Sequence, residues 1–160
     1  MAIILGIDPG LRKTGFGVIS LEKRNLVYKA SGVILPNNEQ SDSMRLKNLF
    51  TSMEEVLKTY SPSHSVIEKV FLNTNPKTTL ALGQARGVAI AAMALHVESI
   101  LELSSNEIKK TVVGNGHASK KQVQFMVQNL LKLEKQASND ASDALAAAIA
   151  LSRKLNKIDL

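Results

Sequence analysis

The sequence predicts an α/β fold in which a mixed five-stranded sheet carries helices on both faces. Three short apolar segments come first, with no helical segment between them, which is typical of an antiparallel meander. Strand-like segments then alternate with segments of helical periodicity, which is typical of parallel strands joined by helices. Because 44% of the 160 residues are hydrophobic, the chain can build one core, and we expect a single domain over residues 1–160.

The predicted strands are short apolar runs closed by turn residues. Five segments have this character, at residues 2–7, 15–20, 26–34, 65–71 and 99–103. The first ends in the turn signal Asp8-Pro9-Gly10. The polar breaks among the first three are too short for a helix, so these neighbouring strands are predicted to run antiparallel.

Helical periodicity predicts the remaining elements, at residues 43–60, 76–97, about 105–112, 119–133 and about 139–155. Asn75 followed by Pro76 is an N-cap and first-turn signature for the second helix. This helix is apolar or small on nearly every side, whereas covering a sheet requires one apolar stripe. We therefore expect its second face to be buried in a two-fold dimer. The alternative is that helices of the C-terminal third cover that face within one chain.

Composition indicates a polyanionic partner. Lys and Arg number 20 against 14 Asp and Glu, which gives a net charge of +6 and a pI near 9.6 and makes nucleic acid the first candidate. The absence of cysteine excludes disulfides and thiolate metal sites and fits a cytoplasmic protein. We expect no secretory signal, since the apolar start lacks a basic region, and no membrane span, since no apolar run approaches the required length of about 18 residues.

Four carboxylates stand out by position: Asp8, Glu68, Asp140 and Asp143. Asp8 ends an apolar strand, and Glu68 interrupts the apolar fourth segment on the same face as Val66 and Val70. A carboxylate in either place is costly unless it is paired or bound to a metal. The structural alternatives are a turn-capping role for Asp8 and an edge-strand ion pair for Glu68.

Asp140 and Asp143 are three residues apart, so they project from one side of the first turn of the last helix. Taken alone, this pair is explained more simply by helix capping, with Asn139 or Asp140 as the cap. However, the apolar residues that follow pack this helix on the sheet and place both acids near strand ends. Carboxylates converging from several elements can hold two Mg²⁺ ions about 3.5 to 4 Å apart for attack on a phosphodiester.

Basic and aromatic residues supply candidate DNA contacts. Residues 107–135 hold six lysines against two glutamates, and Lys109 and Lys120 flank a glycine-rich loop that lets a phosphate backbone approach. Lys121 belongs to the same lysine cluster, and Arg12 and Lys13 add charge beside Asp8. Phe71 ends the fourth segment, where its ring would either stack on an unpaired base or close the core.

Five motifs carry a resemblance that covers the whole chain. They are ILGIDPGLRKTGFGVI at 4–19, IEKVF at 67–71, LGQARGVAIAA at 82–92, IKKTVVGNGHASKKQVQ at 108–124 and DASDALAAAIA at 140–150. In this order and at these distances they resemble the RuvC family of bacterial Holliday junction resolvases, of the ribonuclease H-like superfamily. The loops at 36–43 and 72–79 depart from the family pattern.

The resemblance implies a crossover junction endodeoxyribonuclease with a ribonuclease H-like fold. The metal-binding carboxylates of the family fall on Asp8, Glu68, Asp140 and Asp143, its junction-contacting aromatic on Phe71, and two functional lysines on Lys109 and Lys120. The family further implies a homodimer that binds four-way junctions and, with Mg²⁺ or Mn²⁺, nicks two strands of like polarity symmetrically. It also implies cooperation with the RuvA and RuvB branch-migration proteins in recombination and repair.

Three other functions fit parts of the sequence. The opening strand and turn resemble the phosphate-binding segment of actin-like ATPases, but such proteins need two domains of this kind and 160 residues provide one. A non-catalytic junction-binding module would fit the charge, yet it has no use for four acids at one site. A ribonuclease H-type enzyme that cleaves RNA–DNA hybrids would share the fold and the acids.

Overall fold

The computed structural model describes residues 1–10, 12–37, 39–70 and 74–158. One five-stranded sheet lies at its centre, in the spatial order β3-β2-β1-β4-β5. The strands are β1 (Ala2–Asp8), β2 (Thr14–Glu22), β3 (Asn25–Ile34), β4 (His64–Glu68) and β5 (Ile100–Leu103). The first three form an antiparallel meander, and β4 and β5 run parallel to β1. The predicted mixed sheet is confirmed.

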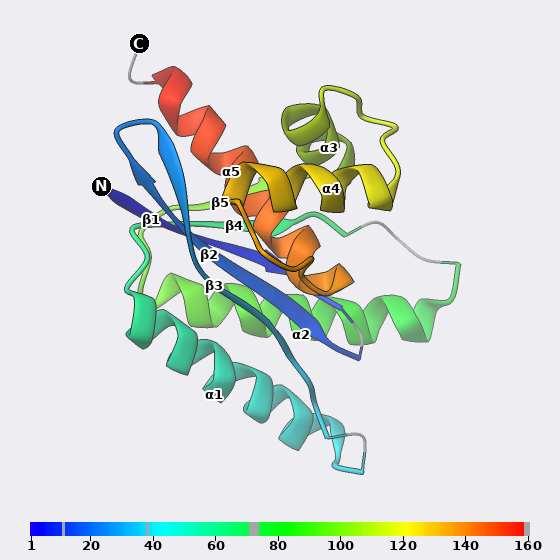
Figure 1. Ribbon diagram of the computed structural model, residues 1–160. Coiled ribbons are helices and arrows are strands. Elements are labelled where there is room, and N and C mark those ends of the chain that lie inside the picture. Colours follow the sequence, from blue (N-terminus) through cyan, green and yellow to red (C-terminus); the bar gives the residue numbers. More distant parts are fainter. Residues whose placement is uncertain (11, 38, 71–73, 159–160) are drawn as a thin grey trace.

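Helices cover both faces of this sheet (Figure 1). They are α1 (Asp42–Tyr60), α2 (Pro76–Ala94), α3 (Ser105–Val113), α4 (Lys120–Leu131) and α5 (Asn139–Ile158). One core cluster joins α1 and α2 to the sheet, and a second joins α3, α4 and α5 to the opposite face. Alternate residues of β1 divide between the two, since Ile4 belongs to the α5 side and Leu5 to the α2 side.

Local sequence signals begin the helices where expected. The Asn75 side chain accepts hydrogen bonds from the backbone N–H groups of Lys77 and Thr78, at 3.0 and 3.3 Å, and Pro76 occupies the first turn. Ser104 and Ser119 form capping boxes at α3 and α4. These caps fix the start of the two helices that carry Lys109 and Lys120.

The predicted carboxyl ends of the fourth strand and of the second helix were wrong. The fourth strand ends at Glu68 rather than at residue 71, because pairing with β5 stops at Leu103. The helix α2 ends at Ala94 rather than at residue 97, since His96 and Val97 donate to the carbonyl of Met93 in a closing turn. Glu68 therefore stands at the carboxyl end of its strand, as Asp8 does.

The helix α5 lies directly on the backbone of β1 and β2. A Cβ atom added to Gly6 would lie 2.1 Å from the carbonyl oxygen of Ala144, and one added to Gly15 would lie 2.1 Å from that of Asp140. Gly17, which pairs with Gly6 across the two strands, would meet Leu145 at 2.8 Å. Glycine is thus required here for the close approach of helix to sheet. This contact sets the height of the first turn of α5 above Asp8.

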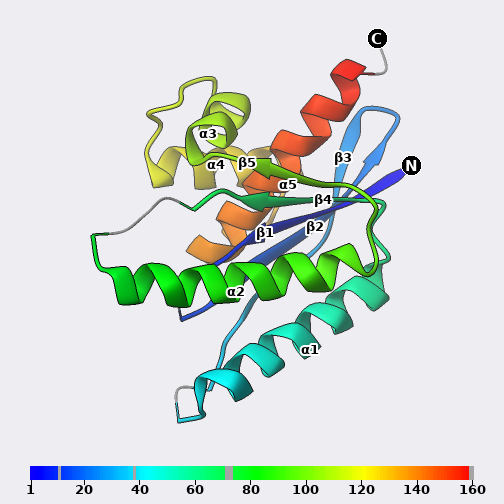
Figure 2. The ribbon, with the colours of Figure 1, turned by 180° about the vertical axis from the view of Figure 1, so that it is seen from behind.

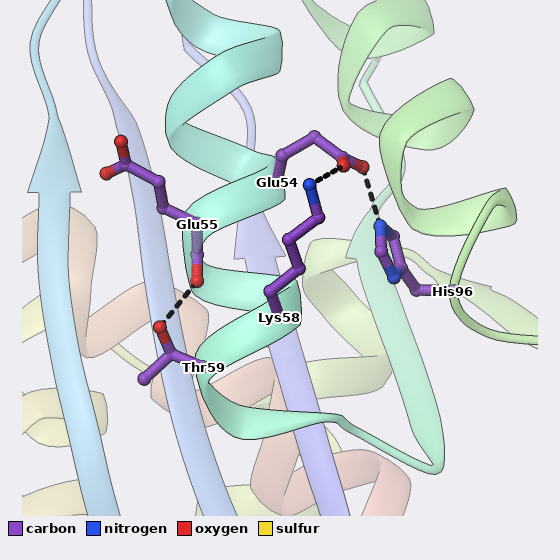
Figure 3. Close-up of polar contacts among 5 residues, drawn as sticks. All are labelled: Glu54, Glu55, Lys58, Thr59 and His96. Atoms are coloured by element: carbon purple, nitrogen blue, oxygen red, sulfur yellow. Dashed lines mark hydrogen bonds and ion pairs between the residues drawn. The ribbon is translucent and has the colours of Figure 1, made fainter.

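One polar contact links α1 to the segment just after α2. Glu54 on α1 accepts from Lys58 at 3.0 Å and contacts the Nε2 atom of His96, just beyond α2, at 2.6 Å (Figure 3). Figure 2 shows α2 running beside α1, while α3, α4 and α5 pack on the opposite face of the sheet. No helix among the described residues is long and apolar enough to cross a membrane.

Candidate active site

The parallel pairing of β1 and β4 brings the first two acids together. Ile7 lies opposite Ile67 in the register, so Asp8 and Glu68 come one step later as neighbours at the carboxyl ends of adjacent strands. Gly6, two residues before Asp8, packs on α5, and Val66, two residues before Glu68, belongs to the core cluster on the α5 side. Since side chains alternate along a strand, both carboxylates face α5. Glu68 also shares hydrogen bonds with Asp8 and with the Ser105 hydroxyl, which donates from the start of α3.

The first turn of α5 supplies the other two acids. Gly15 lies opposite Asp8 in β2, and the backbone of Asp140 rests directly above Gly15. Asp143 follows one turn later and lines a cavity together with Asp8 and Glu68. Ser105, Lys109 and Lys120 complete the polar lining of this cavity. Three separate elements thus deliver carboxylates to one cavity of about 610 Å³, a volume that includes space open to solvent.

Burial and mutual repulsion make this cluster electrostatically unfavourable on its own. Burial, reinforced by the charges of Glu68, Asp143 and Asp140, raises the pKa of Asp8 from 3.8 to about 8. Burial and the charge of Asp143 raise the pKa of Glu68. Burial also raises the pKa of Asp143, although the nearby Lys120 ammonium opposes that shift. The site lacks enough positive charge to balance its acids.

Two lysines partly balance the acids of α5. The Nζ atom of Lys120 lies 3.6 Å from the Oδ2 atom of Asp143, and the Nζ atom of Lys13 lies 3.0 Å from the Oδ2 atom of Asp140. Within the described ranges, no set of three or more histidine, cysteine, aspartate or glutamate side chains is arranged to hold a metal ion as it stands. The donor set nevertheless fits a hard divalent cation, because it consists of carboxylate oxygens in a partly buried cluster short of positive charge.

The predicted DNA-binding residues divide into three groups. Lys109 and Lys120 line the acidic cavity. Arg12 is exposed in the turn after β1, and Lys121 is exposed on α4; neither is among the described residues that line the cavity. Phe71 lies outside the described residues.

Sequence reasoning missed two features of this site. Ser105 was not singled out, although its hydroxyl contacts Glu68. The role of Gly6, Gly15 and Gly17 was also missed. The available signal was the spacing of two residues between Gly15 and Gly17, because glycines on one face of a strand indicate close approach of another backbone.

The comparisons with known proteins agree over nearly the whole chain. The family model described as "Crossover junction endodeoxyribonuclease RuvC" matches residues 4–151. The chain is 52% identical over 147 residues to the protein of that name from Dechloromonas aromatica, which covers 92% of this chain and 82% of the relative. This chain belongs to the RuvC family. A second RuvC relative, from Cupriavidus metallidurans, is 51% identical over 146 residues, covering 91% of this chain and 81% of the relative.

Solved RuvC structures share the fold. The Thermus thermophilus RuvC structure superposes with a TM-score of 0.88 at 24% identity, covering 97% of this chain and 96% of that one. The T. thermophilus RuvC complex with a Holliday junction substrate gives the same TM-score at 21% identity, with 98% and 96% coverage. The yeast mitochondrial Holliday junction resolvase Ydc2 gives 0.70 at 12% identity, with 98% and 81% coverage. The ribonuclease H-like fold expected from the resemblance is confirmed.

Proposed function

We propose that this protein is a metal-dependent endonuclease that resolves four-way (Holliday) DNA junctions by nicking two strands of like polarity symmetrically. The observation that carries the proposal is the cavity in which Asp8, Glu68 and Asp143 meet Lys109 and Lys120. Membership of the RuvC family supports the same reaction, since the relatives are named crossover junction endodeoxyribonucleases. We assign it to homologous recombination and DNA repair.

We assign Asp8, Glu68, Asp140 and Asp143 as the catalytic residues that hold divalent cations, two Mg²⁺ per site, with Mn²⁺ as a substitute. Bound there, such ions would polarise the phosphodiester and lower the pKa of the attacking water. The residues of the chain do the remaining work. Lys109 and Lys120 collect backbone phosphates at the cavity, and Ser105 orients the Glu68 carboxylate by donating a hydrogen bond.

Three further residues are assigned to DNA. Arg12 and Lys121 are exposed cations on the two elements that flank the site, the turn after β1 and the start of α4. Phe71 is proposed to stack on a base exposed at the opened junction. On this assignment Phe71→Ala costs about 1 to 3 kcal/mol in productive binding with little change in melting temperature.

We propose a homodimer formed through α2. One stripe of this helix, made of Ala85, Ala89, Ala92 and Met93, is buried within the chain. A second stripe is exposed and almost wholly apolar or small, and consists of Leu80, Gly83, Gly87, Ala91, Ala94 and Leu95. A self-complementary apolar stripe favours a two-fold dimer, which supplies two active sites for two strands. We further propose RuvA and RuvB as partners, the cytoplasm as the site of action, and one nuclease domain over residues 1–160.

A cleavage assay on matched substrates tests the function. Labelled four-way junction, linear duplex and RNA–DNA hybrid of the same sequence are incubated with the protein, with and without Mg²⁺. We expect paired nicks in the junction with Mg²⁺ alone. Binding of the junction without cleavage would favour the non-catalytic module, and preferential cleavage of the hybrid would favour a ribonuclease H-type enzyme. Asp8→Asn serves as the control against contaminating nuclease.

A further inference from the structure

Asp140 stands apart from the other three acids. Asp8, Glu68 and Asp143 line the acidic cavity, whereas Asp140 is not among the described residues that line it. Its carboxylate is turned to Lys13, with 3.0 Å between Nζ and Oδ2. Asp140 still raises the pKa of Asp8, so it lies within electrostatic reach of the cluster. The fourth carboxylate is therefore near the site but held by a lysine at its margin.

Lys13 lies between Asp140 and a second cavity. Its ammonium group reaches Asp140, while the residue also lines a second cavity, bounded by the β1–β2 turn, the start of α1 and the helix α2. That cavity measures about 530 Å³ including space open to solvent, and Asp42 forms part of its wall. The Lys13 side chain is 52% exposed. The ammonium group of Lys13 therefore has room to leave Asp140 and turn toward solvent.

The ion pair between Lys120 and Asp143 differs from the Lys13 pair in its position. Lys120 lines the acidic cavity together with its partner Asp143. That pair keeps its carboxylate inside the cluster. Only the Lys13 pair, among the two ion pairs described for the α5 acids, joins a carboxylate to a residue that lies outside the cavity.

We propose that Lys13 is a positioning residue that acts as a latch: it holds Asp140 at the margin of the site and releases it when DNA arrives. The inference rests on the proposed function, because it assumes that the acids take up divalent cations. A DNA phosphate close to the turn after β1 competes with Asp140 for the Lys13 ammonium group. Release of Asp140 then adds a fourth carboxylate to the cluster. By linkage, DNA and divalent cations strengthen each other's binding through Lys13.

Binding of Mn²⁺, followed by electron paramagnetic resonance, tests the latch without any cleavage. The variants are Lys13→Gln, Lys13→Arg and, as a matched loss of one positive charge, Lys47→Gln, which changes an exposed residue of α1. Without DNA we expect Lys13→Gln to bind Mn²⁺ about two- to five-fold more tightly than wild type, the range typical of an exposed ion pair. Lys13→Arg and Lys47→Gln should bind as wild type does. A four-way junction should tighten Mn²⁺ binding by a larger factor in wild type than in Lys13→Gln.

A second variant separates the latch from a general charge effect. In an Asp140→Asn background, Lys13→Gln should no longer change Mn²⁺ affinity, because the ion pair is already lost. Equal affinity of wild type and Lys13→Gln, or weaker binding by Lys13→Gln at an unchanged melting temperature, would overturn the latch and leave the metal site standing. Absence of Mn²⁺ binding in every variant would overturn the proposed metal site together with the latch.

Discussion

Asp143 is the acid on which the proposed chemistry is most directly tested. It lines the cavity with Asp8 and Glu68, and its removal takes one negative charge from the cluster. We expect Asp143→Asn to lower the cleavage rate with Mg²⁺ at least about 100-fold, as is typical when electrostatic stabilisation is lost. Junction binding measured in EDTA should be unchanged or stronger, because repulsion of phosphate decreases.

The matched control for Asp143→Asn is Asp42→Asn, which removes the same charge from a carboxylate that is 88% exposed at the start of α1. This variant should cleave at the wild-type rate. If Asp143→Asn retained cleavage within tenfold of wild type, Asp143 would have no catalytic role.

Lys120 is expected to contribute to DNA affinity through a phosphate contact. Lys120→Ala should weaken junction binding and reduce the slope of log affinity against log salt by about one. Anisotropy titrations over a series of salt concentrations, in EDTA, measure that slope. Lys109→Ala should reduce the affinity and the slope in the same way, whereas Lys47→Ala, on the exposed surface of α1, should change neither. An unchanged slope in both cavity-lining variants would show that neither lysine contacts a DNA phosphate.

At the scale of the secondary-structure elements, the contact between α5 and the glycines of β1 and β2 places two acids beside two others. We expect Gly6→Ala to lower the free energy of unfolding by at least about 2 kcal/mol, since its methyl group would overlap the backbone of Ala144. Urea unfolding measures the change. Gly116→Ala, whose methyl group would make an ordinary contact at 3.5 Å, should stay within about 0.5 kcal/mol of wild type. Equal stability of the two variants would disprove the close approach.

The tether between α1 and the end of α2 has a defined pH dependence (Figure 3). Hydrogen bonds from Lys58 and then from His96 hold the pKa of Glu54 below its ordinary value of 4.5. Because the folded state lowers this pKa, the tether stabilises the protein above about pH 4.5 and is lost as the pH falls through the folded value. Glu54→Gln should therefore lower the melting temperature at pH 7, and the difference from wild type should shrink toward pH 3. A difference that does not change with pH would exclude this cause.

At the scale of the whole molecule, a test of the dimer has to change the exposed stripe of α2 and leave the buried stripe intact. Ala91→Glu places a charge on the exposed stripe, and we expect it to yield a folded monomer with paired nicking lost. Ala89→Glu is a poor test, since Ala89 is fully buried within the chain and its substitution would unfold the protein. Sedimentation at micromolar concentration measures the state of assembly. A monomeric wild type with full paired nicking would contradict the dimer.

The alternative covering for α2 within one chain is wrong. The helices of the C-terminal third, α3, α4 and α5, pack on the opposite face of the sheet (Figure 2). Gly83 and Gly87 have open space where a side chain would begin. Periodicity correctly indicated two apolar faces, but it could not show which residues face the core. Ala89 and Ala91 are the same residue type in the same helix, but Ala89 faces the sheet and is buried, whereas Ala91 faces away from it and is exposed.

Short-range physical chemistry determined much of this protein from sequence alone. Turn chemistry at Pro9-Gly10, capping at Asn75 and alternation around Glu68 depend on neighbours within a few residues, so they predicted the strands, the helix start and the face of the acid. Only the tertiary structure decided that Lys13 pairs with Asp140 and that α5 packs directly on Gly6, Gly15 and Gly17. Those contacts join residues more than a hundred positions apart, and their distances follow from how closely a helix backbone can approach a strand that lacks side chains.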